Sequence, residues 1–281
     1  MKLIADSGST KTDWRLLKEN GEQLSFQTEG INPYFHTSET VAKTLRTFSF
    51  APYKHTDIEE VDFYSAGSST VHNKKIMETG FAEVFTNARV NIMHDLLGAC
   101  RALFGKGESG IAAILGTGSN SCLYINQEVV LTLGGQGYIL GDEGSGMHIG
   151  RKVVRDFMND LMPPDALKLF IEEFHLSKDQ IAQAVYKEQL PNRFLATFSK
   201  FVHTHVDHPY FFSLVDDAFM KFFERYIIQY PDYKKYPLRV LGSVGFYFSK
   251  QLHARAAMYD VHIDKIIKAP IEGLVAYHTT H

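Results

Sequence analysis

A glycine-rich window, 110–150, constrains the fold of this chain more than any other stretch. It holds ten of the 21 glycines in the sequence, about three times the share that average usage would give. Two apolar runs, 111–115 and 121–125, flank a Gly-Thr-Gly-Ser-Asn turn at 116–120 and predict a β-hairpin. Glycine allows positive φ and close backbone approach, and the hydroxyl and amide groups of the turn could bind an anionic oxygen. Turns of this composition also form without any ligand.

The amino terminus repeats this design. An apolar run at 2–5 meets an Asp-Ser-Gly-Ser-Thr-Lys-Thr turn at 6–12, and a returning run follows at 13–17. Two such hairpins could close on one phosphate chain from opposite sides, so the pair favours phosphate binding more than either turn alone. The residues expected at the phosphates are Gly8, Ser9, Thr10, Lys11, Gly116, Thr117 and Gly118. Lys11 is explained equally well as a solvated lysine.

Composition narrows the class of protein. Hydrophobic content of 44% and charged content of 22% are typical of a soluble globular protein. A net charge of −3 makes nucleic acid a poor partner, and no apolar stretch approaches the length of a membrane span. Asp6 interrupts the only N-terminal apolar run, so we expect no signal peptide. Two cysteines, Cys100 and Cys122, lie in apolar contexts and indicate a reducing, cytoplasmic location.

The order of expected elements predicts a duplicated α/β architecture. A β-β-β-α-β-α-β-α series occupies 1–108, and a second β-β-β start begins at 110 after the linker 105–109. We expect an N-terminal α/β domain over 1–108 and a C-terminal α/β domain with a helical extension over 109–267. The later elements are expected to be helices at 145–158, 165–174, 178–186, 192–205 and 212–230, a strand at 238–241, a helix to about 257, and a strand at 261–263.

The motifs resemble those of the actin/hexokinase ATPase superfamily, whose ribonuclease H-like lobes are duplicated. The closest likeness is to N-acetylglucosamine kinases and their relatives among BadF/BadG-type ATPases. It rests on five places: the two turns, His-Asp-Leu-Leu-Gly-Ala at 94–99, Gly-Gly-Gln-Gly-Tyr-Ile-Leu-Gly-Asp-Glu-Gly-Ser-Gly at 134–146, and Leu-Gly-Ser-Val at 241–244. The long signature is specific, and the others are individually modest. Ser7 and Ser9 depart from a first motif that is usually richer in glycine.

The resemblance implies an ATP-dependent amino-sugar kinase with two lobes, and a last helix at about 268–281 that packs back on the first lobe. It implies that Asp95 is the catalytic base and that Asp6 holds Mg²⁺ through water. The implied adenosine-binding residues are Gly242, Ser243 and Gly245. The implied sugar-binding residues are Asn32, Asp95, Ser119, Asn120, Gln136 and Asp142. Mammalian N-acetylglucosamine kinases have an aromatic residue where this chain has Gln136, so glucosamine is also a candidate substrate.

Other interpretations of these residues remain open. Asp95 and Asp142 precede expected helices and could be N-caps, and Asn32 could stabilise a turn before proline. The glycines at 242 and 245 could simply shape a helix start. At the level of function, an ATPase that activates a dehydratase through a shared iron–sulfur cluster is one alternative. A non-catalytic nucleotide sensor is another. The expected assembly is a homodimer.

Overall fold

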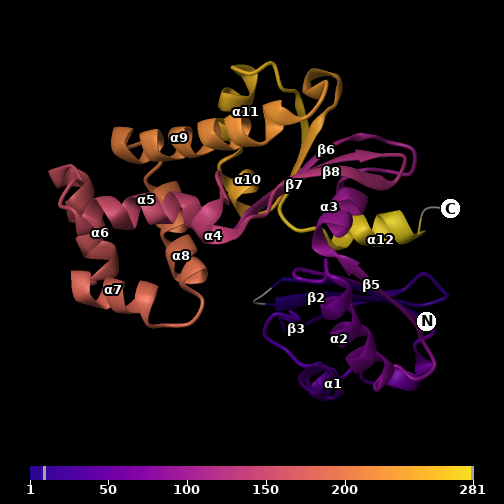
Figure 1. Cartoon of the computed structure of the whole chain (residues 1–281). Helices are drawn as coiled ribbons and strands as arrows, with labels where there is room; N and C mark the ends of the chain where they lie inside the picture. The colour runs from indigo at the N-terminus through magenta and orange to yellow at the C-terminus, as the bar shows by residue number, and fades with distance from the viewer. Residues whose placement is uncertain (9–10, 280–281) are drawn as a thin grey trace. The chain divides into compact units, whose positions relative to one another are not determined.

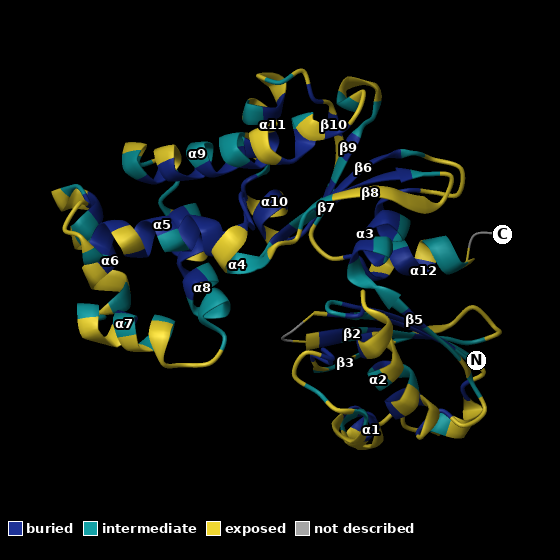
Figure 2. Cartoon of the chain, in the orientation of Figure 1, coloured by how far each residue is buried: buried dark blue, intermediate teal, exposed yellow. Residues whose placement is uncertain are grey.

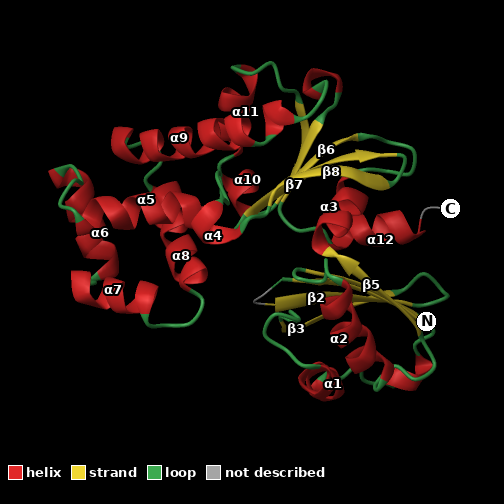
Figure 3. Ribbon diagram, in the orientation of Figure 1, coloured by secondary structure: helices red, strands yellow, loops and turns green. Residues whose placement is uncertain are grey.

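The computed structural model describes residues 1–8 and 11–279. Its internal contacts divide the chain into two compact units (Figure 1). The N-terminal unit comprises Met1–Gly107 with Pro270–His281, and the C-terminal unit comprises Glu108–Ala269. Each unit has its own mixed sheet covered by helices (Figure 3).

The sheet of the N-terminal unit has the order β3-β2-β1-β4-β5. Strands β1 and β2 pair antiparallel, as do β2 and β3, whereas β4 is parallel to β1 and to β5. Its strands are β1 Lys2–Ser7, β2 Lys11–Leu17, β3 Gln23–Glu29, β4 Glu60–Ser65 and β5 Arg89–His94. Its helices are α1 Ser38–Thr47, α2 Val71–Ala82, α3 Asp95–Leu103 and α12 Ile271–Thr279, with a 3-10 turn at His55–Asp57.

Alternation along β2 decides which face of this sheet is core. Thr12, Trp14 and Leu16 are buried, and the rings of Phe63 and Phe81 lie 5.5 and 6.5 Å from Trp14. The residues between them point to the other face, because successive side chains of a strand alternate. This alternation places the side chains of 11, 13 and 15 together, away from the aromatic core.

The last helix packs against α3 within the same unit. A Cβ added to Gly273 would lie 2.4 Å from the carbonyl oxygen of Ala102, so only glycine allows this approach. Arg15 on β2 also pairs with Glu272. The C-terminal helix is therefore an integral layer of the N-terminal unit.

The C-terminal unit repeats the same strand pattern. Its sheet has the order β10-β9-β6-β7-β8, with β6-β7 and β7-β8 antiparallel and β6-β9 and β9-β10 parallel. Its strands are β6 Gly110–Leu115, β7 Ser119–Ile125, β8 Glu128–Gly134, β9 Leu238–Leu241 and β10 Ile263–Ile267. The five strands correspond one to one with β1–β5 in order and direction. The two units therefore share one architecture, which is the duplicated, two-lobed α/β fold that the sequence predicts.

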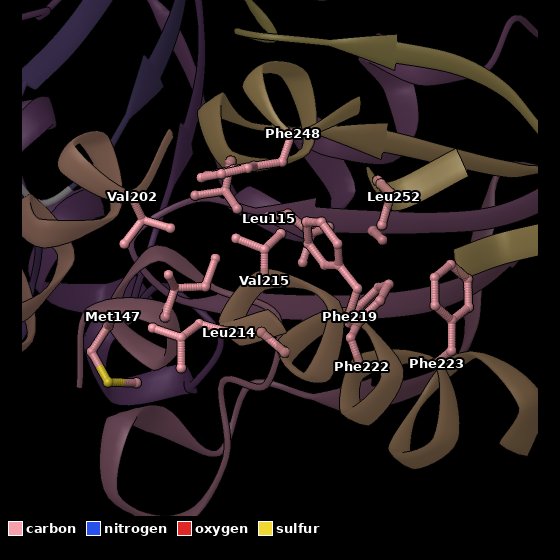
Figure 4. Packing of buried hydrophobic residues seen from close by; sticks show 14 of the residues in the cluster. Leu115, Met147, Val202, Leu214, Val215, Phe219, Phe222, Phe223, Phe248 and Leu252 are labelled. Carbon is pink, nitrogen blue, oxygen red and sulfur yellow. The ribbon is translucent and has the colours of Figure 1, made fainter. Parts of the chain in front are cut away.

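A helical layer covers and extends this second sheet. The helices are α4 Gly137–Leu140, α5 Gly146–Met158, α6 Pro164–Phe174, α7 Lys178–Tyr186, α8 Pro191–Thr204, α9 Pro209–Arg225, α10 Ser243–Tyr247 and α11 Ser249–Ala257. The side of α9 that carries Val215, Phe219 and Phe222 is fully buried, and these residues cluster with Leu115 and Phe248 (Figure 4). Ten of the thirteen residues of α5 are buried, which makes it the central helix of the layer (Figure 2).

Three element predictions are wrong in detail. Helix α9 ends at Arg225 rather than Tyr230, and a 3-10 turn, Ile227–Gln229, follows. The chain leaves the helix there because the hydroxyl of Tyr230 bonds to Ser121 Oγ at 2.8 Å and accepts the Leu133 N–H at 3.0 Å. The last strand is Ile263–Ile267 rather than 261–263, since pairing with β9 sets its position.

The third error concerns the segment after β9. It forms two helices that meet at the buried Phe248, rather than one continuous helix to residue 257. In the described part of the chain, no helix is long and apolar enough to cross a membrane.

Candidate functional site

Three carboxylates meet beside the first turn of the N-terminal unit. Asp6 on β1 lies opposite Asp13 on β2 in the strand register, and Asp95 is the first residue of α3. Burial raises the pKa of Asp6 from 3.8 to about 7, and repulsion from Asp95 and Asp13 adds to that rise, whereas Lys11 opposes it. Asp13 is a member of this group that the sequence motif did not indicate. The alternation of β2 brings it to the same face as Lys11.

Asp95 is not the N-cap of its helix. The cap is His94, whose Nδ1 accepts the N–H of Leu96 at 3.3 Å. The carboxylate oxygen Asp95 Oδ1 accepts no hydrogen bond from the described residues, although His94 Nε2 lies 3.1 Å away. Burial raises the pKa of Asp95, and the neighbouring His94 opposes the rise. A carboxylate that has a raised pKa, and an oxygen that accepts no hydrogen bond from the described residues, is suited to accept a proton.

These carboxylates do not form a metal cage. Among the described residues, no three His, Cys, Asp or Glu side chains are arranged to hold a metal ion together. Mg²⁺ keeps several waters and commonly takes one or two protein carboxylates, so a single aspartate is an adequate donor set. The repulsion that raises the pKa of Asp6 would be relieved by a cation at this point, which fits a magnesium ion beside Asp6.

The first turn is closed by its backbone. The N–H of Gly8 donates to the carbonyl of Lys11 at 3.0 Å. Ser9 and Thr10, both predicted to contact phosphate, lie outside the described residues. Lys11 extends into solvent and forms an ion pair with Asp13 at 2.7 Å. This ion pair holds the Lys11 ammonium group beside the first turn, close to the three carboxylates Asp6, Asp13 and Asp95.

Ser7 joins this turn to the segment that carries Asn32. Its Oγ lies 2.7 Å from Thr12 Oγ1, donates to the carbonyl of Ile31 at 3.0 Å and accepts the N–H of Ile31 at 2.9 Å. Asn32 is buried, and its Oδ1 accepts the N–H of Tyr34 at 2.9 Å, as in an Asx turn. Of the two interpretations of Asn32, turn former and sugar ligand, this contact agrees with the first. Ser7, a departure from the family pattern, has a clear positioning role.

In the C-terminal unit, the second turn is anchored to the start of α5. The N–H of Gly146 donates to the carbonyl of Gly116 at 2.8 Å, and that of Met147 donates to the carbonyl of Thr117 at 3.1 Å. Gly116 N–H bonds to the carbonyl of Gly118 at 3.0 Å, which tightens the turn. The side chain of Thr117 is exposed at the tip. The turn therefore exposes the Thr117 hydroxyl on a backbone that hydrogen bonds to the start of α5 hold in position.

Asp142 lies directly behind this turn. A Cβ added to Gly118 would lie 2.9 Å from Asp142 Oδ2, so the glycine makes room for the carboxylate. Asp142 Oδ1 accepts the N–H of Ser119 at 3.2 Å. The cap of α5 is Ser145, so the N-cap interpretation of Asp142 is wrong. Burial raises the pKa of Asp142, and the bond from Ser119 partly offsets this.

The other predicted sugar-binding residues of this unit surround Asp142. Ser119 Oγ donates to the carbonyl of Glu143 at 2.8 Å. Asn120 Oδ1 accepts the N–H of Ser121 at 2.9 Å, and its side chain lies 2.9 Å from the Cβ position of Gly135. Gln136 is exposed. The structure thus brings Ser119, Asn120 and Asp142 together and leaves Gln136 at the edge, where its Oε1 lies 3.5 Å from the Tyr226 hydroxyl.

Glu143 is a buried residue that the sequence motif contained but the site prediction omitted. Its carboxylate accepts a short hydrogen bond from the hydroxyl of Tyr226 and pairs with Arg225 at 2.8 Å. These partners are more than 80 residues away in the sequence, so no local pattern could identify them. The interaction connects the end of α9 to the glycine signature, at the residue next to Asp142.

The predicted adenosine-binding residues follow β9. Gly242 has φ +124°, and a Cβ there would lie 2.3 Å from the carbonyl oxygen of Leu115. A Cβ on Gly245 would lie 2.5 Å from Val240 Cγ1. Both glycines are therefore required by packing inside the unit, as the helix-start interpretation expects. Ser243 is exposed, and its side chain is available for a ligand.

Known proteins similar to this chain were found by sequence and by structure, whereas no family model matches it. A solved candidate N-acetylglucosamine kinase from Porphyromonas gingivalis is 38% identical with a TM-score of 0.93, covering 99% of this chain and 98% of that one. A curated N-acetyl-D-glucosamine kinase from Dictyostelium discoideum is 23% identical over 193 residues, 62% of this chain, and the match spans 60% of that relative.

A third likeness concerns the fold alone. A ROK-family glucokinase from Streptomyces griseus, solved with glucose and AMPPNP, is 13% identical with a TM-score of 0.54, covering 98% of this chain and 97% of that one. Both units are needed for such coverage, so the likeness extends over the whole duplicated architecture.

Proposed function

The chain belongs to the N-acetylglucosamine kinase and BadF/BadG-type ATPase family of the actin/hexokinase superfamily, and we propose that it transfers the γ-phosphate of ATP to a hydroxyl of an amino sugar. The observation that carries this proposal is the Asp95 carboxylate. It follows directly on a strand end, its pKa is raised by burial, and its Oδ1 accepts no hydrogen bond from the described residues. Nucleotide binding alone requires no such group.

In this mechanism Asp95 accepts the proton of the attacking sugar hydroxyl as that oxygen approaches the γ-phosphate. The turn at Gly116–Gly118 offers the Thr117 hydroxyl and backbone N–H groups to the phosphates, and Lys11 adds charge beside the first turn. Mg²⁺, when bound with ATP, would neutralise the phosphate oxygens, and Asp6 would hold it through water. Asp142 would accept hydrogen bonds from sugar hydroxyls, together with Asn32, Ser119 and Asn120.

The dehydratase-activator alternative has less support. An iron–sulfur cluster shared between subunits needs cysteines that a partner can reach. Cys100 in α3 and Cys122 in β7 are both fully buried. A brown colour in the purified protein would favour this alternative again. We keep a homodimer and a cytoplasmic location as parts of the proposal, and light scattering of the purified protein would test the first.

The proposal is tested by a coupled ADP-release assay with saturating ATP and Mg²⁺. The sugars are glucosamine, N-acetylglucosamine, N-acetylmannosamine, a muramic-type sugar and glucose. We expect kcat/KM to be highest for one of the amino sugars. A preference for glucose, or ATP hydrolysis that no sugar stimulates, would contradict the proposal.

An Asp95→Asn variant tests the base. Asparagine keeps the size of the side chain but cannot take the proton, so we expect kcat to fall by about 10²–10⁴. The melting temperature should not fall, because His94 rather than Asp95 caps α3 and the variant removes a buried charge. The matched control is Asp207→Asn, an exposed carboxylate of the C-terminal unit, which should keep the parent rate. An Asp95→Asn protein with near-parent kcat would remove the base from this mechanism.

A further inference from the structure

A cavity of about 550 Å³ lies within the helical layer of the C-terminal unit. Its walls come mainly from α5 and α7, with contributions from α4, α8 and α9. None of the residues assigned above to phosphate, sugar, adenosine or metal lines it. Cavities of 300–1,000 Å³ are the usual size for small-molecule sites. The cavity is therefore large enough for a ligand of its own.

Four cationic side chains line the cavity, those of Arg151, Lys152, Arg155 and Lys221. Two carboxylates pair with them. Asp217 contacts Lys152 and lies 2.9 Å from Lys221, and Asp156 lies 3.0 Å from Arg155. Among the lining side chains and their ion-pair partners, four cations meet two carboxylates, a surplus of two positive charges. Two further carboxylates lie near this group: Asp142, whose pKa Arg151 lowers, and Glu143, which pairs with Arg225. This surplus occurs in a chain whose net charge is −3, so it is a local feature of the cavity.

Arg151 is the cation best placed to bind a ligand. One of its N–H groups donates to the carbonyl of Tyr138 at 2.9 Å, and no carboxylate of the described residues forms an ion pair with it. A guanidinium has five N–H donors, so further donors remain. Beside it, the buried His148 has its pKa lowered to about 4 by burial and by the charges of Lys152 and Arg151. Burial is the larger cause of this shift, and the charge of Glu143 opposes it.

Part of the cavity wall is apolar. Ile181, Val185 and Tyr186 of α7 and Val154 of α5 line it. The side chain of Tyr186 is 81% exposed and that of Ile139, from α4, is 71% exposed. Large apolar side chains exposed around a cavity are typical of its entrance, because they are stabilised when a ligand covers them.

We propose that this cavity binds an amphipathic anion, a molecule with a carboxylate or phosphate head and an apolar body. The head contacts Arg151, and the body lies against α7. A small inorganic anion would leave the apolar wall uncovered, and a neutral apolar molecule would leave the surplus charge unmatched. This site goes beyond the proposed kinase activity and needs neither sugar nor ATP.

The test is a fluorescence titration of the full-length protein with 8-anilinonaphthalene-1-sulfonate, which is itself an amphipathic anion. Sodium octanoate, octyl phosphate, octan-1-ol and inorganic phosphate then compete for the bound dye. We expect the two amphipathic anions to displace the dye, and the alcohol and inorganic phosphate to need at least about tenfold higher concentration. Octanoate and octyl phosphate differ only in the head, so their relative affinity identifies which head the site prefers.

Variants locate the binding. Arg151→Gln should weaken octanoate binding by about tenfold or more, as expected for the loss of a charge-assisted hydrogen bond. Tyr186→Asp places a repelling carboxylate at the entrance without disturbing the core and should have a similar effect, so it serves if Arg151→Gln folds poorly. The matched control is Lys250→Gln, an exposed cation of the same unit that lies outside the cavity.

The proposal is overturned if octan-1-ol competes as well as octanoate, if the dye does not bind, or if Lys250→Gln weakens binding as much as the two cavity variants. Because the readout uses no nucleotide or sugar, these outcomes are independent of whether the kinase assay succeeds.

Discussion

Asp6 should make the protein without ligands less stable as pH rises through neutrality. Its pKa in the folded chain is about 7, against an ordinary value of 3.8, because of burial and of repulsion from Asp95 and Asp13. The folded state therefore binds the Asp6 proton more tightly than the unfolded state. Below the unfolded-state pKa, a carboxylate whose folded-state pKa is raised does not lower the free energy of unfolding. Between the two pKa values it lowers the free energy of unfolding progressively as pH rises, and above the folded-state pKa the loss is constant.

The size of this effect follows from the shift. Each pKa unit corresponds to about 1.4 kcal/mol, so the full cost above pH 7 approaches roughly 4 kcal/mol. Between pH 5 and pH 8 the cost grows by roughly 2.6 kcal/mol. Asp6→Asn removes the ionisation, and it should stabilise the protein much more at pH 8 than at pH 5.

The measurement is thermal unfolding of parent and Asp6→Asn proteins at pH 5 and pH 8, with EDTA to exclude divalent cations. The advantage of the variant at pH 8 should exceed its advantage at pH 5 by about 5–10 °C, given about 2–4 °C per kcal/mol for units of this size. Glu19→Gln, which removes an exposed carboxylate of the same unit, should show no such difference. A melting-temperature change in Asp6→Asn that is equal at both pH values would refute the reasoning.

Three further predictions concern packing, charge and metal. Gly150→Ala should lower the melting temperature of the C-terminal unit by several degrees, because the added Cβ would lie 1.9 Å from the carbonyl oxygen of Leu195; a thermal melting curve measures this. Arg151→Gln should raise the pKa of Asp142, because the Arg151 charge lowers it, and the acid limb of the sugar kcat/KM profile should move to higher pH. Chelation of divalent cations should abolish phosphorylation and Mg²⁺ should restore it, while Asp6→Asn should lower kcat with little change in sugar KM; loss of sugar binding instead would contradict the metal assignment.

Much of the fold could be predicted from local patterns. Apolar runs either side of the two Gly/Ser/Thr turns locate the β1–β2 and β6–β7 hairpins, because strand and turn signals act within about ten residues. The capping box at the start of α1 is equally local, since Thr37 and Thr40 are three residues apart. The end of α9 and the position of β10 could not be predicted, since the contacts of Tyr230 and the pairing with β9 are long-range.

Local sequence patterns specify the chemical groups of this protein and the elements that carry them: aspartates at the ends of strands, glycine turns, and a duplicated strand order. Tertiary packing, in contrast, sets how those groups act on one another. It makes His94 the cap and leaves Asp95 with an oxygen to spare, and it joins Glu143 to Tyr226 across more than 80 residues. It also raises the pKa of Asp6, because burial and repulsion depend on distances that pairing and packing set and sequence spacing does not.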